Sequence, residues 1–253
     1  MIVRSEIEYK RVNQIRAGYE RKYKYLFDAL LMKQFKDVAA KVTADNLTPD
    51  VSTIVKQDDT QKLFVNLYQV VGVDFAKQTY NSKKANDNMV DTWEQYMKRY
   101  ATMRAGKRIS SITKVTKEEI QRIMKAVIEQ SVEDGLGSAE TARIIKRELT
   151  KQGEQINTWR ALRIARTEVM TASNQGSLKG ARDLEVPTNK IWIATVDERS
   201  RSWHAAMNGK EVDINEAFDV SGVPMECPGD PDGLPEDIIN CRCTIAYRVR
   251  RER

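Results

Sequence analysis

Residues 6–42 repeat apolar side chains at spacings of three, four and five, and contain no proline. This period matches the α-helix and places the apolar groups on one face of a long amphipathic helix. That face consists of Ile7, Val12, Ile15, Tyr19, Tyr23, Leu26, Phe27, Leu30, Leu31, Phe35 and Val38. The chain is therefore predicted to begin with one long helix and to be mainly α-helical.

Breaks in the helical pattern divide the next part of the chain. The segment 45–49 ends in proline, and because proline and its predecessor resist helical geometry, a turn or linker is predicted there. Helical spacing returns at residues 63–75 and 89–100, and residues 107–112 interrupt it again. We interpret residues 1–110 as a helical N-terminal region.

A helical body is predicted for residues 111–186. Thr116 and Glu119 have the spacing of a capping box, in which each side chain bonds the backbone amide of the other, so a helix is expected to begin there. Glycines at 135 and 137 would end it, and Ser138 and Thr158 would cap two further helices. The inner face of the first helix would consist of Ile120, Ile123, Met124, Val127 and Ile128.

The composition changes after Pro187. Residues 190–196 and 244–249 are rich in β-branched and aromatic side chains and are predicted to be strands that pair with each other. Between them we expect a short helix over 199–207, a tight turn at Asn208 and Gly209, and a shaped loop over 221–240, which holds four of the six prolines. Residues 187–253 are thus interpreted as a small α+β module after the helical body.

Composition limits the class of protein. The 253 residues are 41% hydrophobic, which is enough for one large or two ordinary domains, and the formal net charge of +6 favours a polyanionic partner without requiring one. No apolar run is long enough to cross a membrane, and the charged N-terminus does not resemble a secretory signal, so synthesis in the cytoplasm is expected. The basic residues considered for DNA contact are Lys22, Lys24, Arg104, Lys107, Arg108, Arg250 and Arg251, although a solvated helix face is the favoured interpretation of the basic stretch at 10–24.

All three cysteines and the single histidine lie in the last fifty residues, at His204, Cys227, Cys241 and Cys243. Thiolate and imidazole are the usual ligands of a tetrahedral structural zinc ion, and the module has few large apolar residues after position 197, so zinc would stabilise it. Cys241 and Cys243 can share one metal ion only if the backbone turns at Arg242, because alternate residues of a strand face opposite sides. Buried free thiols, or a disulfide from Cys227 to a neighbour, remain alternatives.

A second group of polar residues lies at 163–168 and 197–199 and consists of Arg163, Arg166, Glu168, Asp197 and Arg199. Arginine–carboxylate ion pairs that join the helical body to the small module are the favoured interpretation. A metal-dependent nuclease using His204, Asp197 and Glu168 is the alternative. An enzyme is not favoured, because no second histidine exists for acid–base chemistry and no phosphate-binding loop motif is present.

Three motifs, in order, resemble the phage Mu F-like head morphogenesis family of minor capsid proteins. They are RIARTEVMTASNQG at 163–176, VDERSRSWHAAMNGKEVD at 196–213 and INCRC at 239–243, and the resemblance covers about residues 115–248. It implies a portal-associated protein inside a tailed-phage capsid that acts in head assembly and in genome packaging or ejection. Residues 1–110 lie outside the resemblance, and we expect them to engage the portal protein. Scaffold or major capsid protein and packaged DNA are further implied partners. A nuclease or toxin-like effector carried with the phage genome is the alternative.

The chain departs from the pattern of that family at the metal ligands. Relatives carry a C-x₂-C before the Asn-Gly turn and an H-x₂-C-x-C near the end. Here His204 stands where the second of the first two cysteines would fall, and Ile238 replaces the late histidine. Cys227 has no counterpart in that pattern and could replace a lost ligand. One zinc-ligating residue type replacing another favours a site made of His204, Cys227, Cys241 and Cys243.

Overall fold

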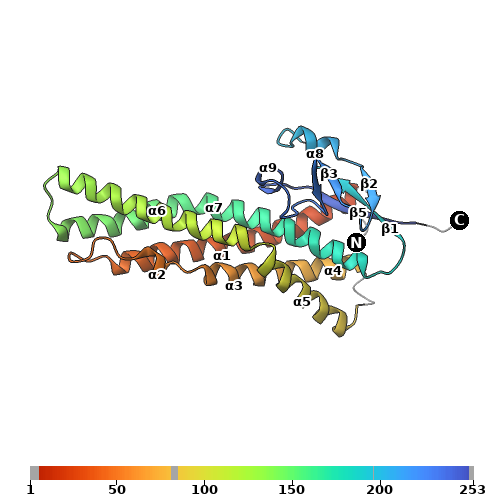
Figure 1. The fold of residues 1–253 in the computed structure, drawn as a ribbon, viewed down its shortest axis with the longest axis horizontal. Coiled ribbons are helices and arrows are strands. Elements are labelled where there is room, and N and C mark those ends of the chain that lie inside the picture. Colours follow the sequence, from red (N-terminus) through yellow and green to blue (C-terminus); the bar gives the residue numbers. More distant parts are fainter. Residues whose placement is uncertain (1–5, 81–84, 196, 251–253) are drawn as a thin grey trace. The chain divides into compact units, whose positions relative to one another are not determined.

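The computed structural model describes residues 6–80, 85–195 and 197–250, and its mainly helical architecture confirms the predicted fold class (Figure 1). No helix within these residues is long and apolar enough to cross a membrane. The helices are α1 (Glu6–Lys41), α2 (Val51–Ile54), α3 (Gln57–Leu67), the π-helix η1 (Tyr68–Gly72), α4 (Val73–Tyr80), α5 (Asp87–Met103), α6 (Gly106–Glu133), α7 (Ser138–Arg182), α8 (Ser202–Ala206) and α9 (Pro235–Ile238). The strands are β1 (Thr188–Ile193), β2 (Glu211–Asp213), β3 (Phe218–Val220), β4 (Val223–Met225) and β5 (Thr244–Val249).

The chain divides into two compact units made of discontinuous segments. Unit 1 contains Met1–Lys22, Phe64–Arg104 and Ala165–Arg253, and unit 2 contains Tyr23–Leu63 and Ala105–Ile164. Helices α1, α3 and α7 each contribute residues to both units. The units therefore do not follow the consecutive segments 1–110, 111–186 and 187–253, because side-chain packing groups helices that are distant in the sequence.

Unit 2 is a helical bundle around one apolar core. The second half of α1 supplies Phe35 and Val38, α6 supplies Ile120 and Met124, and the first half of α7 adds Ile145 and other apolar groups to the same cluster. Within this unit α6 and α7 lie side by side (Figure 1). A Cβ at Gly153 of α7 would lie 2.9 Å from the Phe35 ring, so a side chain there would disturb the packing.

In unit 1 the π-helix η1 and α4 pack closely against the second half of α7. A Cβ on Gly176 would lie 1.9 Å from the carbonyl oxygen of Gly72, and one on Gly180 would lie 2.5 Å from that of Ala76. Real Cβ atoms do not approach backbone this closely, so both positions of α7 require glycine. The two backbones are thus in direct contact at the place where η1 ends.

The C-terminal strands form a three-stranded antiparallel sheet in the order β2-β1-β5 and a separate β3-β4 hairpin. The predicted pairing of the first and last strands is confirmed, with Ile191 opposite Ala246 and Ile193 opposite Thr244. Predicted residue Val196 lies outside the described residues, and β1 ends at Ile193. Strands β2, β3 and β4 were not anticipated, because each is only three residues long.

The long first helix and the glycine end of α6 agree with the sequence predictions. Helix α1 ends at Lys41, and Gly135 adopts a φ of 68° just after α6. Gly209 likewise has a φ of 82° at the predicted turn before β2. Of the predicted apolar face of α1, the side chain of Ile7 lies outside the described part of the chain.

Two predicted helix starts were wrong. Helix α6 begins at Gly106 rather than at Thr116, because Ile109 and Thr113 extend its buried stripe by two turns. The Thr116 hydroxyl donates to the carbonyl of Ile112, one turn back, instead of capping a helix. The hydroxyl of Thr158 makes the same kind of bond to Glu154, and α7 runs without a break from Ser138 to Arg182.

Although few large apolar residues follow position 197, the module does contain a hydrophobic core. Trp192 of β1 and Phe218 of β3 are fully buried with ring centroids 5.3 Å apart, and Met225 and Ile238 pack in the same cluster. Met170 of α7 completes this core. Tertiary contact with the helix supplies apolar surface that the local sequence lacks.

Candidate metal centre

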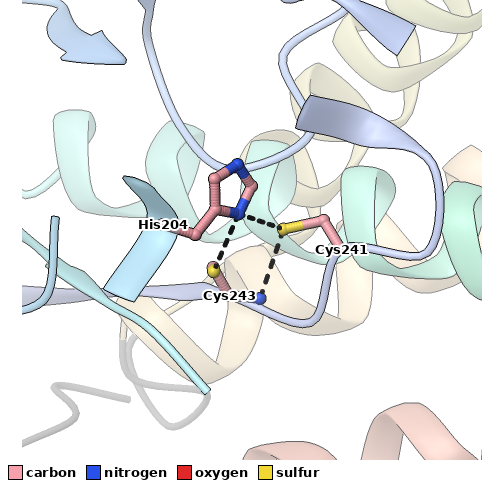
Figure 2. A group of neighbouring side chains, drawn as sticks. All are labelled: His204, Cys241 and Cys243. Carbon is pink, nitrogen blue, oxygen red and sulfur yellow. Dashed lines mark hydrogen bonds between the residues drawn. The ribbon is translucent and has the colours of Figure 1, made fainter. Parts of the chain in front are cut away.

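Three of the four predicted metal ligands lie together. His204 comes from α8, and Cys241 and Cys243 come from the segment between α9 and β5 (Figure 2). The His204 Nδ1 atom lies 3.6 Å from the sulfur of Cys241 and 3.5 Å from that of Cys243. All three residues are buried, and their ligand atoms lie within 4.8 Å of one another.

The backbone satisfies the condition that the C-x-C spacing imposes. Residues 241–243 are not part of a strand, and Asn240 just before them has a φ of 58°. The amide of Cys243 donates to the Cys241 sulfur at 3.4 Å, which curls the backbone around that atom. Both sulfurs consequently point to the same side, toward the imidazole (Figure 2).

The second imidazole nitrogen faces a carboxylate. His204 Nε2 lies 3.6 Å from Asp237 Oδ1, too long for a hydrogen bond but close enough for electrostatic attraction. Trp203 Nε1 donates to the same oxygen at 2.8 Å and so holds the carboxylate in place. With a metal ion bound, a carboxylate behind the histidine would favour a proton on Nε2 and leave Nδ1 as the ligand atom.

The pKa values of the two thiols are shifted in opposite directions. A hydrogen bond from the Cys241 thiol, assisted by His204, lowers the pKa of Cys243 to about 5. The same hydrogen bond, together with burial, raises the pKa of Cys241 well above its usual value.

The cluster fits a tetrahedral metal ion by distance and by donor type. Zn–S bonds of about 2.3 Å and Zn–N bonds of about 2.05 Å at the tetrahedral angle separate nitrogen from sulfur by about 3.6 Å. The distances from His204 to the two sulfurs match that separation. A hollow of about 20 Å³ lies beside the three residues, which is room for one water-sized group. The structure thus supplies three protein ligands and space next to them.

Cys227 does not join this group, which corrects the predicted set of four ligands. Its sulfur accepts a hydrogen bond from Gln175 Nε2 at 2.9 Å, and it packs with Leu178, Ile245 and Tyr247 in a separate cluster. Cys227 follows β4 and turns its side chain toward α7, whereas Cys241 and Cys243 belong to the Trp192 cluster. All three cysteines are free thiols, so the disulfide alternative is also not observed.

The predicted ion-pair residues do not pair with one another as expected. Arg166 lies 3.5 Å from Glu20 of α1, and Asp197 lies 2.7 Å from Arg242 of the C-x-C segment. Glu168 is buried and accepts a hydrogen bond from the Tyr68 hydroxyl at 2.8 Å. Arg163 and Arg199 are exposed. Glu168 and Asp197 thus have separate structural roles, and neither belongs to the metal-binding group of described residues.

The residues considered for DNA contact are mostly surface residues with varied surroundings. Arg104 is engaged by Asp232 at 2.5 Å and by Asp230 at 3.4 Å, and Arg250 lies 2.8 Å from Asp213. Acidic partners reduce the charge that these two arginines offer to a phosphate. Lys22 and Lys107 are exposed, Lys24 and Arg108 are half-buried, and Arg251 lies outside the described residues.

Arg16 was predicted to belong to a basic helix face, but it is buried, with 4% of its surface exposed. Its Nε donates to Ser173 at 2.7 Å, and its Nη atoms donate to Thr244 at 3.0 Å and to the Cys243 carbonyl at 3.3 Å. Burial lowers its pKa to about 10, so it stays charged at neutral pH. The sequence did contain a sign of this burial, because Arg16 lies one turn after Val12 on the apolar face of α1.

The family-like motif at 163–176 is a buried polar face of α7. Asn174 Nδ2 donates to the carbonyl oxygens of Pro228 at 2.9 Å and Cys243 at 3.1 Å. The Thr167 hydroxyl oxygen accepts from the amide of Asn240 at 3.1 Å. These bonds hold the two loops that carry the cysteines against the helix. That role was not apparent from the motif alone.

Comparisons with known proteins agree with the family that the three sequence motifs indicate. The family described as "Phage Mu protein F like protein" matches residues 121–246. The minor head protein GP7 of Bacillus phage SPP1 is 28% identical over 138 residues, which cover 53% of this chain and 42% of that protein. A protein of Enterococcus faecalis named NAD(+)–arginine ADP-ribosyltransferase EFV is 34% identical over 143 residues, which cover 55% of this chain but 28% of that protein. The chain thus spans less than half the length of either relative, and no solved structure matches it.

Proposed function

Because the chain belongs to the phage Mu protein F-like family, we propose that it is a minor head protein of a tailed phage that acts inside the capsid during head assembly. The observation that carries this proposal is the match to residues 121–246, which includes all of α7, the strands β1 to β4, the start of β5 and the metal cluster. The likeness to a phage minor head protein supports the same role. Roles in genome packaging or ejection are part of the proposal.

We propose the portal protein as the partner, bound through the helices of unit 2. Tyr25 on α1 and Trp159 on α7 both belong to that unit and are 73% and 75% exposed. Aromatic side chains of this kind are enriched among the residues that dominate protein–protein binding energies. Water-exposed tryptophan is otherwise uncommon on a protein surface. Scaffold or major capsid protein are the alternative partners.

Reconstitution with the neighbouring portal protein tests this role. The two purified proteins should co-sediment, and Trp159→Ala together with Tyr25→Ala should weaken the complex without changing the free energy of unfolding. Leu136→Ala, at a side chain of unit 2 that is 39% exposed, is the matched control. Sedimentation of the two proteins apart, at any ratio, would contradict the proposal.

We further propose that the metal is a structural Zn²⁺ ion held by His204, Cys241 and Cys243. The support is the match of the nitrogen–sulfur distances to tetrahedral zinc and the carboxylate of Asp237 behind the imidazole. A bound ion would tie α8 to the segment before β5. Metal analysis of the purified chain should find one zinc ion per molecule, and absence of zinc would favour plain buried thiols.

Direct DNA contact by the basic segments is a weaker part of the proposal. Lys22 and Lys107 are exposed cations that could contact phosphate, and the net charge of +6 is favourable. Such binding would be independent of sequence and would weaken as salt displaces the contacts. A filter-binding titration at two salt concentrations tests it, and affinity that does not fall with salt would exclude this mode.

An enzymatic role is the second candidate, favoured by two observations. One relative is named as an ADP-ribosyltransferase, and the cluster has three protein ligands rather than a closed set of four. Three ligands with an open position are the usual arrangement of catalytic zinc. The matched region is only 28% of that relative, so its name describes a much longer protein. Incubation with plasmid and divalent metals tests the nuclease form, and intact plasmid in every condition would exclude it.

A further inference from the structure

A cleft of about 540 Å³ lies beside the metal centre in unit 1 and is lined by arginine. Its walls come from α1, from α7, from the segment before α8 and from the segment after α9. It shares Cys241 and Arg242 with the hollow next to the metal cluster, so the two spaces adjoin. The charged lining residues are Arg16, Glu20, Arg166, Arg199, Arg201 and Arg242.

The charges around this cleft do not balance. Five guanidinium groups line it, and the carboxylates that meet them are Glu20, which lies against Arg166, and Asp197, which lies against Arg242. Arg201 donates to the main-chain carbonyl of Ile239 at 2.7 Å, which is a neutral partner. Arg16 likewise donates to neutral groups. Among the described residues no carboxylate meets Arg16, Arg199 or Arg201, and the low-pKa Cys243 side chain near Arg16 offsets one of these three charges.

Two of the five arginines, Arg16 and Arg242, are held in place by hydrogen bonds. Arg16 is buried and fixed by four hydrogen bonds, and Arg242 is fixed by Asp197. Rigid guanidinium groups lose little conformational entropy on binding, and their planar forks match tetrahedral oxyanions. A cleft of this volume is within the range of small-ligand sites.

We infer that this cleft binds a phosphate group, carried either by a small phosphorylated molecule or by a nucleic-acid backbone. The site differs from the basic segments named from the sequence, because Arg166, Arg199, Arg201 and Arg242 were not among them. Binding here does not depend on a role in the capsid, so the inference and the proposed function can fail separately.

The test uses the purified full-length chain and two probes. Inorganic phosphate is titrated by calorimetry, and a short fluorescent DNA duplex is titrated by anisotropy. Binding of phosphate alone assigns the cleft to a small ligand, and displacement of the duplex by phosphate assigns it to the nucleic-acid backbone. Absence of binding by either probe at millimolar phosphate overturns the inference.

Variants locate the binding. Arg166→Gln together with Arg199→Gln removes two cations from the cleft and should weaken affinity about tenfold or more. Arg143→Gln together with Arg147→Gln on the exposed face of α7 changes the net charge equally and should have little effect. Equal losses in both double variants would place the binding elsewhere and overturn the inference.

A variant that should bind phosphate more tightly distinguishes a change in the site from a loss of the fold. Among the described residues, Glu20 supplies the one carboxylate that lines the cleft, so Glu20→Gln should make phosphate bind several-fold more tightly. A damaged fold could only lower the affinity. Unchanged or weaker phosphate binding by a folded Glu20→Gln protein would overturn the inference.

Discussion

The Arg16 side chain joins α1 to the segment that carries the cysteines. Its guanidinium donates to Ser173, Thr244 and the Cys243 carbonyl, and its charge lies 5.7 Å above the Phe75 ring. These acceptors are buried, so removal of the donor would leave them without partners and without water. The position of Cys243 is thereby linked to a residue more than two hundred positions earlier in the chain.

Replacement of Arg16 should be strongly destabilising. Arg16→Met is expected to lower the free energy of unfolding by about 3 kcal/mol, because several buried acceptors lose their donor at once. Arg16→Lys should recover only part of the loss, since one ammonium cannot reproduce the planar fork. Urea denaturation measures both. Wild-type stability in Arg16→Met would show that the hydrogen bonds contribute nothing net.

The cysteines should separate into two classes when each is changed to serine. Cys241→Ser and Cys243→Ser are expected to abolish tight zinc binding, because each removes one of three protein ligands. Cys227→Ser should retain zinc, since its sulfur accepts from Gln175 and lies in another cluster. Zinc content per chain after dialysis is the measurement. Equal zinc loss in all three variants would mean that Cys227 is a ligand after all.

Tyr96 makes stability depend on alkaline pH. Burial raises its pKa from 10.0 to about 12, so the folded state keeps the phenol proton longer than the unfolded state does. The resulting stability is complete below pH 10 and is lost as the pH rises toward 12, by about 2 kcal/mol at most. Tyr96→Phe should show a smaller loss over that window. Thermal unfolding at pH 9, 10 and 11 compares the two proteins, and identical pH profiles would exclude this contribution.

At the scale of the helices, the contact between α7 and η1 depends on glycine. Gly176→Ala would place a Cβ 1.9 Å from the Gly72 carbonyl oxygen, so the helices must separate, at a cost of about 3 kcal/mol or more. Gly18→Ala in α1 meets nothing within 4 Å and should stabilise by about 0.5–1 kcal/mol through helix propensity. Chemical denaturation of both variants is the measurement. A mild effect of Gly176→Ala would show that the two backbones can move apart easily.

The helices also show what the sequence can predict. Periodicity placed α1 within one residue at its C-terminal end, and β-branched residues identified β1 and β5, because both signals are local. Local signals misled at Thr116 and Thr158, since a threonine hydroxyl can bond the preceding turn inside a helix as readily as it caps one.

The sequence predicted only part of the candidate site, because the rest of the site depends on contacts between residues that are distant in the chain. Because imidazole and thiol groups are the usual ligands of zinc, the sequence correctly predicted that His204, Cys241 and Cys243 lie together. No local pattern could show that Cys227 turns toward Gln175, or that Asp237 lies behind the imidazole, because those contacts arise from tertiary packing. The buried polar face of α7 around Asn174 was visible only as a motif until its loop partners were placed.

At the scale of the whole molecule, the metal cluster and the bundle core of unit 2 belong to different compact units. His204, Cys241 and Cys243 all lie in unit 1, whereas Ile120 and Met124 of α6 lie in unit 2. A metal that binds only the folded state stabilises the region whose opening breaks its ligand set. The effect of chelation should therefore differ between the two units.

Hydrogen exchange with and without a zinc chelator measures that difference. Amides of β1 should exchange faster after chelation, because Trp192 packs in the core that includes Cys241 and Cys243. Amides of β5 should follow, because β5 begins directly after Cys243 and pairs with β1. Amides in the middle of α6 should keep their protection, since their core contains none of the three ligands. Cys243→Ser should already exchange fast in β5 and should show no further response to the chelator. Equal acceleration in α6 and β5 would mean that the units open together, and no change in either would mean that the zinc ion, if bound, contributes nothing to the fold.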